Sequence, residues 1–85
     1  MRVCIPTPLR SYTNAKWVEA EGATIDGVLR NLDEHYPGIR FRVVDEQGRL
    51  RQHMKVFVNQ ESVRDLASSL EGVEELTIMQ ALSGG

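Results

Sequence analysis

The sequence lacks the features that would indicate several common classes of protein. One cysteine in 85 residues permits no internal disulfide and excludes an iron–sulfur cluster, since such a cluster needs about four cysteines. The net charge is -2, whereas a nucleic-acid-binding domain usually has an excess of basic residues. No hydrophobic run approaches the roughly 18 residues of a membrane-spanning helix or forms a signal peptide. We therefore expect one small cytoplasmic domain that binds neither nucleic acid nor membrane.

The chain also has few residues that could form a catalytic or metal site. Cys4 has no histidine near it in the sequence, and a partly buried structural role is the simpler interpretation. His35 and His53 show no spacing typical of metal ligands. Because no nucleophile, base and oxyanion-binding group can be assembled, we expect a protein that is not an enzyme and that binds no cofactor or metal.

The hydrophobic pattern predicts one main helix and several strands. Hydrophobic residues recur at helical spacing from Ile25 to Tyr36, Thr24 precedes them as an N-cap, and Pro37-Gly38 ends the helix. Alternating residues predict strands at 2–5, 16–21, 54–58, 61–63 and 73–79, with turns at 11–14, 45–48 and 59–60. A sheet with one helix across it buries the hydrophobic stripe of that helix and leaves its other face open.

The segment between the helix and the third strand has a less regular pattern. Residues 39–44 fit either a short helical turn or a strand. Arginines at positions 40, 42, 49 and 51, together with Lys55, make this part of the chain basic, although Asp45 and Glu46 dilute the charge. We interpret this basic segment as solvated surface, with phosphate binding as the minor alternative.

Alternation along the strands predicts which side chains lie on the open face of the sheet. If Leu76 and Ile78 face the helix, Met79 faces away, and the same argument turns Phe57 outward. Cys4 and Trp17 fall on that face as well. Exposed aromatic and apolar side chains on one face are typical of a docking surface, so we predict a partner surface built on Phe57 and Met79. A register shifted by one residue, or a middle segment folded over this face, is the alternative.

The last five residues have the composition of a reactive tail. Residues 81–85 carry no charged side chain, no aromatic ring and no proline, and Gly85 supplies the α-carboxylate. Gly84 and Gly85 have no Cβ, so they can lie extended in a narrow slot, while Ser83 is small and Leu82 offers one apolar anchor to a partner. We predict a domain over residues 1–80 and a flexible tail over 81–85. The alternative is a frayed end or a cloning remnant.

Three segments occur in an order typical of one protein family. Gly22-Ala23-Thr24-Ile25 precedes the helix, residues 56–63 form a Val-Phe-Val-Asn hairpin, and Leu70-Glu71-Gly72 leads to the last strand and the terminal glycines. With these segments the chain resembles the MoaD/ThiS family of sulfur carriers over essentially its whole length, and residues 3–10 and 50–53 resemble the CysO/QbsE branch. The resemblance implies an α+β fold, the ubiquitin-like β-grasp, with a mixed sheet of four to five strands, one main helix packed on one face and a flexible C-terminal tail.

The same resemblance implies a function for Gly85. In this family an enzyme of the ubiquitin-activating type adenylates the C-terminal glycine with ATP, and sulfur then replaces AMP to give a thiocarboxylate. ATP and a sulfur source are thus used by the partner, and no cofactor is bound by the carrier. The implied partners are this adenylating enzyme, a sulfur-accepting synthase, and a metallopeptidase that trims or releases the C-terminus.

The resemblance leaves the pathway and one alternative open. The sulfur would serve cysteine, siderophore, thiamin or molybdopterin synthesis. A ubiquitin-like modifier conjugated to lysines through Gly85 needs the same acyl-adenylate, so the tail does not separate it from a sulfur carrier. A non-covalent β-grasp binding module is the third class, and its activity would survive removal of Gly84 and Gly85.

Overall fold

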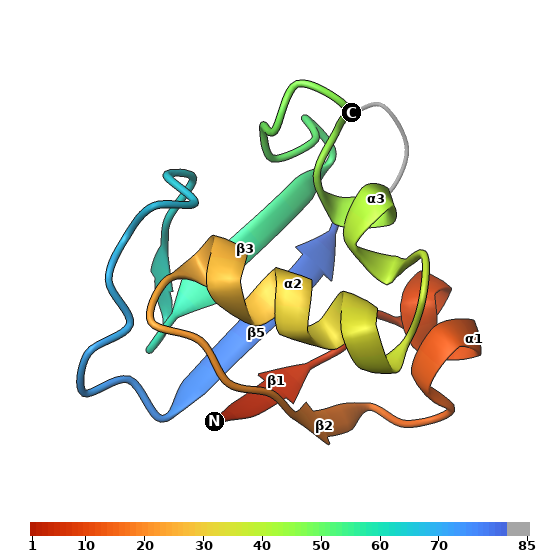
Figure 1. Ribbon diagram of the computed structural model, residues 1–85, viewed down its shortest axis with the longest axis horizontal. Coiled ribbons are helices and arrows are strands. Elements are labelled where there is room, and N and C mark those ends of the chain that lie inside the picture. Colours follow the sequence, from red (N-terminus) through yellow and green to blue (C-terminus); the bar gives the residue numbers. More distant parts are fainter. Residues whose placement is uncertain (82–85) are drawn as a thin grey trace.

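The computed structural model describes residues 1–81 of the chain, and Figure 1 shows the arrangement of the elements. Along the sequence these are β1 (Arg2–Cys4), the 3-10 helix η1 (Thr7–Leu9), α1 (Arg10–Thr13), β2 (Trp17–Glu19), α2 (Ile25–His35), α3 (Ile39–Val43), β3 (Met54–Val58), β4 (Glu61–Ser62) and β5 (Glu75–Gln80). Of the tail predicted over residues 81–85, residues 82–85 lie outside the described residues.

The five strands form one mixed sheet in the order β2-β1-β5-β3-β4. The first and last strands, β1 and β5, are parallel, with Val3 opposite Leu76, whereas the other neighbouring strands are antiparallel. A parallel pair needs a long crossover connection, and the chain between β1 and β5 includes α2, which crosses the sheet (Figure 1). The predicted mixed sheet with one main helix is confirmed.

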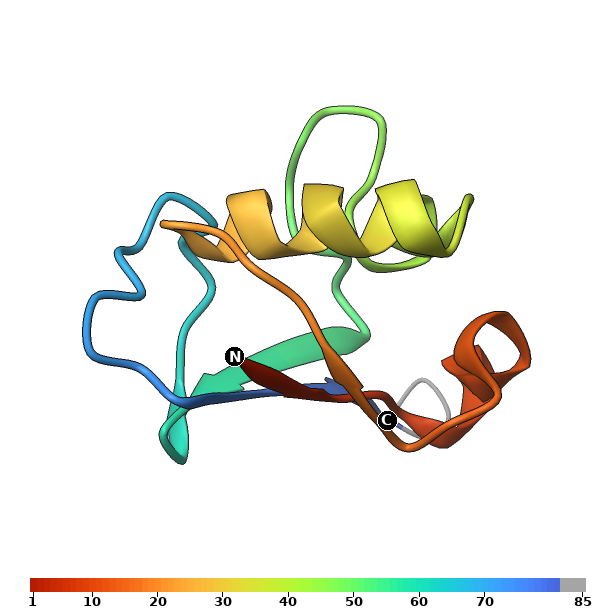
Figure 2. The same cartoon turned by 60° about the horizontal axis from the view of Figure 1, so that its bottom comes forward.

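Helix α2 covers one face of the sheet because its hydrophobic residues lie on one side. Ile25, Val28, Leu29 and Leu32 are each at most 1% exposed. The hydroxyl of Thr24 accepts a hydrogen bond from the backbone N–H of Gly27 at 3.0 Å, which confirms the predicted N-cap. In Figure 2 the helix lies above the sheet, and no helix of the described residues crosses the opposite face.

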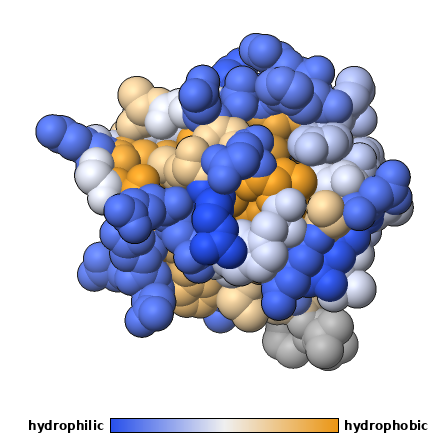
Figure 3. Space-filling view, turned by 90° about the horizontal axis from the view of Figure 1, so that it is seen from below, coloured by the Kyte–Doolittle hydropathy of each residue, from blue (hydrophilic) through white to orange (hydrophobic). Residues whose placement is uncertain are grey.

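The core lies between the helices and the sheet. Val3, Val56, Leu76 and Ile78 are at most 1% exposed, so every second residue of the central strands faces α2 as predicted. In Figure 3, which shows the molecule from below relative to Figure 1, hydrophobic residues come to the surface between hydrophilic ones. The helix-facing side of the sheet is therefore occupied by the core, and a partner surface has to use the open face or the periphery.

The conformation of two segments became clear only from the structure. The turn predicted at 11–14 was wrong, because residues 7–13 form η1 and α1, and Asn14 ends α1 in the left-handed conformation at φ 54°. Leu9 is buried at the junction of the two helices, and this burial favours a compact helical segment over an open turn. Residues 39–43 form α3, the helical alternative for this segment, with Ile39 and Val43 buried.

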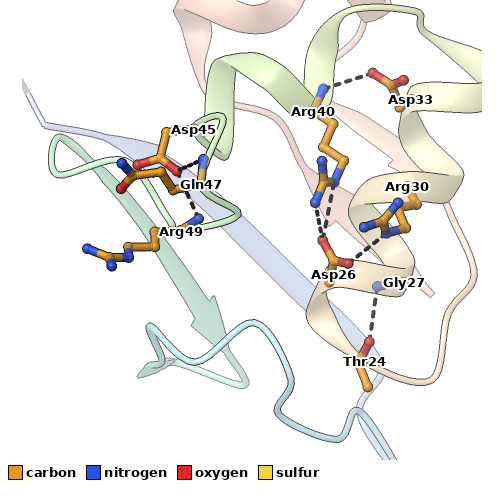
Figure 4. A network of polar contacts seen from close by, with 9 residues as sticks. All are labelled: Thr24, Asp26, Gly27, Arg30, Asp33, Arg40, Asp45, Gln47 and Arg49. Atoms are coloured by element: carbon orange, nitrogen blue, oxygen red, sulfur yellow. Dashed lines mark hydrogen bonds and ion pairs between the residues drawn. The ribbon is translucent and has the colours of Figure 1, made fainter.

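Asp26, in the first turn of α2, joins two elements through two arginines. Its Oδ2 accepts a hydrogen bond from Nε of Arg30 at 2.7 Å, and its Oδ1 accepts one from Nη2 of Arg40 at 2.8 Å (Figure 4). Asp33 Oδ1 accepts hydrogen bonds from the backbone N–H groups of Gly38 and Arg40, both at 3.1 Å. Because Arg40 belongs to α3, these contacts fix the position of α3 against α2.

Replacement of Asp26 by asparagine is expected to lower the free energy of unfolding by about 1 kcal/mol at pH 7, a value reduced for solvent screening because the pair is partly exposed. Partial burial by itself would raise the pKa of Asp26, but the hydrogen bonds and charges of Arg30 and Arg40 outweigh it and lower the pKa below 3.8. A carboxyl group whose pKa is lower in the folded protein than in the unfolded one stabilises the fold fully at pH values above its unfolded pKa. This stabilisation is lost as the pH falls through its folded pKa.

Urea denaturation of both proteins as a function of pH measures this contribution. The difference between wild type and Asp26→Asn should be constant at neutral pH and should shrink below pH 3.8. A difference that stays constant into that acid range would show that the charge of Asp26 does not stabilise the fold.

Candidate functional site

The open face of the sheet carries a row of side chains from four strands. Trp17 pairs with Cys4, Cys4 pairs with Thr77, and Thr77 pairs with Phe57. These residues alternate with the buried core positions, so they lie on the face that α2 does not cover. The predicted outward placement of Phe57 and Met79 is therefore correct, and Met79 is 48% exposed.

Phe57 and Met79 border a shallow hollow on this face. It is lined by Phe57, Asn59, Gln60, Glu75, Thr77 and Met79. Phe57 and Met79 supply its hydrophobic part, and the polar groups of the turn after β3 form its border. An apolar centre with a polar rim is the usual anatomy of a protein–protein interface.

Trp17 lies on this face, as its place in the strand pattern predicted, but another side chain covers its ring. The guanidinium carbon of Arg2 lies over the Trp17 ring, 4.2 Å from its centroid, and the same arginine approaches Glu75 at 3.9 Å. Arg2 therefore covers the indole and gives this end of the face a charged character. Phe57 and Met79 are the better candidates for an apolar contact.

The end of β5 shows where the tail leaves the domain. Met79 lies opposite Lys55, and Gln80 lies opposite Met54 at the start of β3. One residue further, the backbone N–H of Ala81 donates a hydrogen bond to the carbonyl of His53 at 2.7 Å. The predicted tail-binding residues Leu82, Ser83 and Gly84, and the predicted reactive Gly85, lie outside the described residues.

Other candidate sites gain no support from the geometry. Within residues 1–81, no three His, Cys, Asp or Glu side chains lie close enough together to hold a metal ion. His35 lies at the end of α2, where its Nδ1 is 3.0 Å from the carbonyl oxygen of Asn31. Cys4 is half-buried in the sheet. None of the helices in the described part of the chain has the length and hydrophobicity to cross a membrane.

Sequence reasoning missed one exposed aromatic residue. Phe41 lies on α3 and is 54% exposed, and the Arg51 guanidinium carbon is 4.6 Å from the centroid of its ring. A helical reading of residues 39–43 would have placed Phe41 away from buried Ile39 and Val43. Because the pattern of residues 39–44 fits a strand as well as a helix, the sequence does not predict that the Phe41 ring faces outward.

The sequence and the fold both match known proteins. A family model described as the ThiS family matches residues 3–85. The chain belongs to the ThiS family. Sulfur carrier protein CysO of Mycobacterium tuberculosis is 37% identical over 89 residues, which cover 98% of this chain and 96% of CysO. The sequence resemblance to MoaD/ThiS carriers, and to their CysO branch, is thereby confirmed.

Solved structures place this ThiS-family member among ubiquitin-like β-grasp proteins. The crystal structure of M. tuberculosis CysO has a TM-score of 0.88 at 36% identity, covering 95% of this chain and 98% of that chain. A chain of the Amycolatopsis orientalis BexX/CysO complex has a TM-score of 0.87 at 38% identity, covering 99% and 98%. SAMP1 of Haloferax volcanii has a TM-score of 0.78 at 26% identity, covering 100% and 98%. The predicted fold is confirmed.

Proposed function

We propose that this ThiS-family protein is a sulfur carrier whose Gly85 carboxylate is activated and converted to a thiocarboxylate. The observation that carries the proposal is the match to CysO over 98% of the chain. A family model that extends to residue 85, and so includes both terminal glycines, supports the same assignment. The protein acts as a co-substrate of another enzyme and is not itself an enzyme.

The proposed reaction has two steps at the carbonyl carbon of Gly85. A carboxylate oxygen first attacks the α-phosphorus of ATP and releases pyrophosphate, because a free carboxylate is a poor electrophile. A sulfur nucleophile then attacks the acyl-adenylate and releases AMP, which leaves one carboxylate oxygen replaced by sulfur. The activating enzyme supplies ATP and its binding site, and the carrier binds no cofactor of its own.

The chain contributes a docking face and a slim tail to this chemistry. Phe57 and Met79 form the apolar contact with the activating enzyme. Gly84 and Gly85, without a Cβ, pass through a narrow channel to the nucleotide, and Ser83 and Leu82 follow them. β5 belongs to the docked face and ends at Gln80, directly before the tail. Docking of this face therefore fixes the start of the tail relative to the activating enzyme.

A second partner receives the sulfur. The CysO chain of A. orientalis was solved in a complex with another protein, BexX, which supports a protein partner for this carrier. We assign that role to a sulfur-accepting synthase in the cytoplasm. A metallopeptidase that trims or releases the C-terminus is a further proposed partner. The acceptor belongs to cysteine, siderophore, thiamin or molybdopterin synthesis.

The alternative function is that of a protein modifier. SAMP1, a small archaeal modifier protein, is 26% identical to this chain with a TM-score of 0.78. Conjugation would use the same acyl-adenylate but would transfer Gly85 to a lysine amine. The higher identity to CysO, 37%, favours the carrier.

Pyrophosphate exchange tests the activation step. With an activating enzyme for ThiS-family carriers, the wild-type chain is expected to promote exchange of labelled pyrophosphate into ATP, because formation of the acyl-adenylate is reversible. The chain lacking Gly85 should promote none. Equal exchange by the truncated chain would contradict the proposed role of the Gly85 carboxylate.

A further inference from the structure

The exposed ring of Phe41 is held in place by an arginine from another part of the chain. Arg51 Nε donates a hydrogen bond to the carbonyl of Phe41 at 2.8 Å, and its guanidinium carbon is 4.6 Å from the centroid of the Phe41 ring. A guanidinium that stacks on an aromatic face gains a cation–π interaction. The ring is thus kept at the surface, where an isolated large hydrophobic side chain costs solvation free energy unless something covers it.

Phe41, Arg42, Arg51 and His53 line one hollow of the surface, which we name the basic rim. Neither Arg42 nor Arg51 forms an ion pair with a carboxylate of residues 1–81, where the arginines in ion pairs are Arg2, Arg30 and Arg40. The nearby Asp45 attracts Arg51 electrostatically, but it forms no ion pair with this arginine, and one of its oxygens already accepts hydrogen bonds from two backbone N–H groups. A positive surface on a chain of net charge -2 is therefore available to an acidic partner.

The basic rim lies where the tail leaves the domain. His53 belongs to the rim, and its carbonyl accepts the hydrogen bond from the N–H of Ala81. Gly85 is four positions beyond Ala81 in the sequence, and an extended chain spans at most about 3.6 Å per residue, so the tail can carry Gly85 no further than roughly 14 Å from this point. An enzyme that acts on Gly85 has to bring its surface within that distance of the basic rim.

We propose that the basic rim docks against acidic side chains at the entrance of the channel through which the activating enzyme receives the tail. This inference rests on the proposed function of Gly85. Arginine favours carboxylates because its planar guanidinium presents paired donors, and Phe41 gives the contact an apolar centre. α3 carries Phe41 and Arg42 and packs against α2. It therefore lies on the helix-covered side of the sheet, whereas Met79 lies on the open face. Contacts on both faces would fix the direction in which the tail enters.

Charge reversal at Arg42 tests the proposal. Arg42 is exposed, and no hydrogen bond of its side chain is found within residues 1–81, so Arg42→Glu should leave the fold intact. The matched control is Arg49→Glu, the same charge change at an exposed residue whose side chain borders a different hollow, near Thr24 and Asp26. Phe41→Ala is a second variant that alters the rim without changing its charge.

The measurement is the carrier KM and kcat of the activating enzyme, from pyrophosphate exchange at low and high salt. Arg42→Glu should raise KM about tenfold at low salt with kcat unchanged, and the effect should shrink at high salt because added ions screen the charges. Phe41→Ala should raise KM several-fold at both salt concentrations. Arg49→Glu should stay within about twofold of wild type.

Two results would overturn the proposal in distinguishable ways. If wild type is activated and Arg42→Glu behaves as Arg49→Glu does, the basic rim does not meet the enzyme, while the role of Gly85 stands. If wild type itself supports no exchange with an enzyme that activates another carrier, the proposed function fails and this inference fails with it.

Discussion

Replacing Met79 by aspartate is expected to lower kcat/KM for activation of the chain about 100-fold, which corresponds to about 2.7 kcal/mol. Met79 is 48% exposed at the hollow on the open face, and the contact proposed there is apolar. An aspartate would bring a charged side chain into a desolvated interface, and desolvation of a charge costs several kcal/mol.

The fold should tolerate this substitution. Met79 lies directly opposite Lys55 on β3, so the new carboxylate would face an amine across the strands, a favourable cross-strand pair. Ala67→Asp is the control, because it adds the same charge at an exposed residue of the loop between β4 and β5. Normal activation of Met79→Asp would show that the open face is not the docking surface.

Replacing Gly22 by alanine is expected to lower the free energy of unfolding by about 3 kcal/mol, near the upper end of the usual range for overpacking. A Cβ at Gly22 would lie 2.4 Å from the backbone nitrogen of Val28 and 2.6 Å from the backbone carbon of Gly27. These atoms belong to the first turns of α2 and cannot rotate away as a side chain can. The chain before α2 would have to move, and the cap at Thr24 with it.

Thermal unfolding followed by circular dichroism measures this loss. For a domain of this size, about 3 kcal/mol corresponds to a fall in Tm of roughly 12–24 °C. Gly48→Ala is the control: its φ is +80°, but an added Cβ meets no atom within 4 Å, so it should cost about 1–2 kcal/mol from backbone strain alone. A Tm of Gly22→Ala close to that of wild type would mean that the close approach to α2 is easily relieved.

The regular elements could be predicted from the sequence because burial imposes a period on them. The apolar stripe over residues 25–36 predicted α2 (Ile25–His35). The alternation of β3 and β5 placed Phe57 and Met79 on the open face. Gly22 follows the strand predicted over residues 16–21, but its close approach to the backbone of Val28 depends on how the chain packs. Local sequence contains no information on such a distance.

The parts of the site that could not be predicted depend on contacts between distant residues. The cover of Trp17 by Arg2 depends on the register of β1 against β2. The basic rim depends on Arg51 reaching back ten residues to Phe41. From the sequence alone, the arginines of the basic rim are interpreted as solvated surface. Their position beside the end of β5 follows from the pairing of β3 with β5, which only the structure shows.

Intact-protein mass spectrometry tests the central claim most directly. The wild-type chain is incubated with an activating enzyme for ThiS-family carriers, ATP and a sulfide source, beside a chain that lacks Gly85. The account predicts that the wild-type mass rises by the difference between sulfur and oxygen and that the truncated chain is unchanged. An unchanged wild-type mass, with an enzyme that converts another carrier in the same assay, would contradict the assignment as a sulfur carrier.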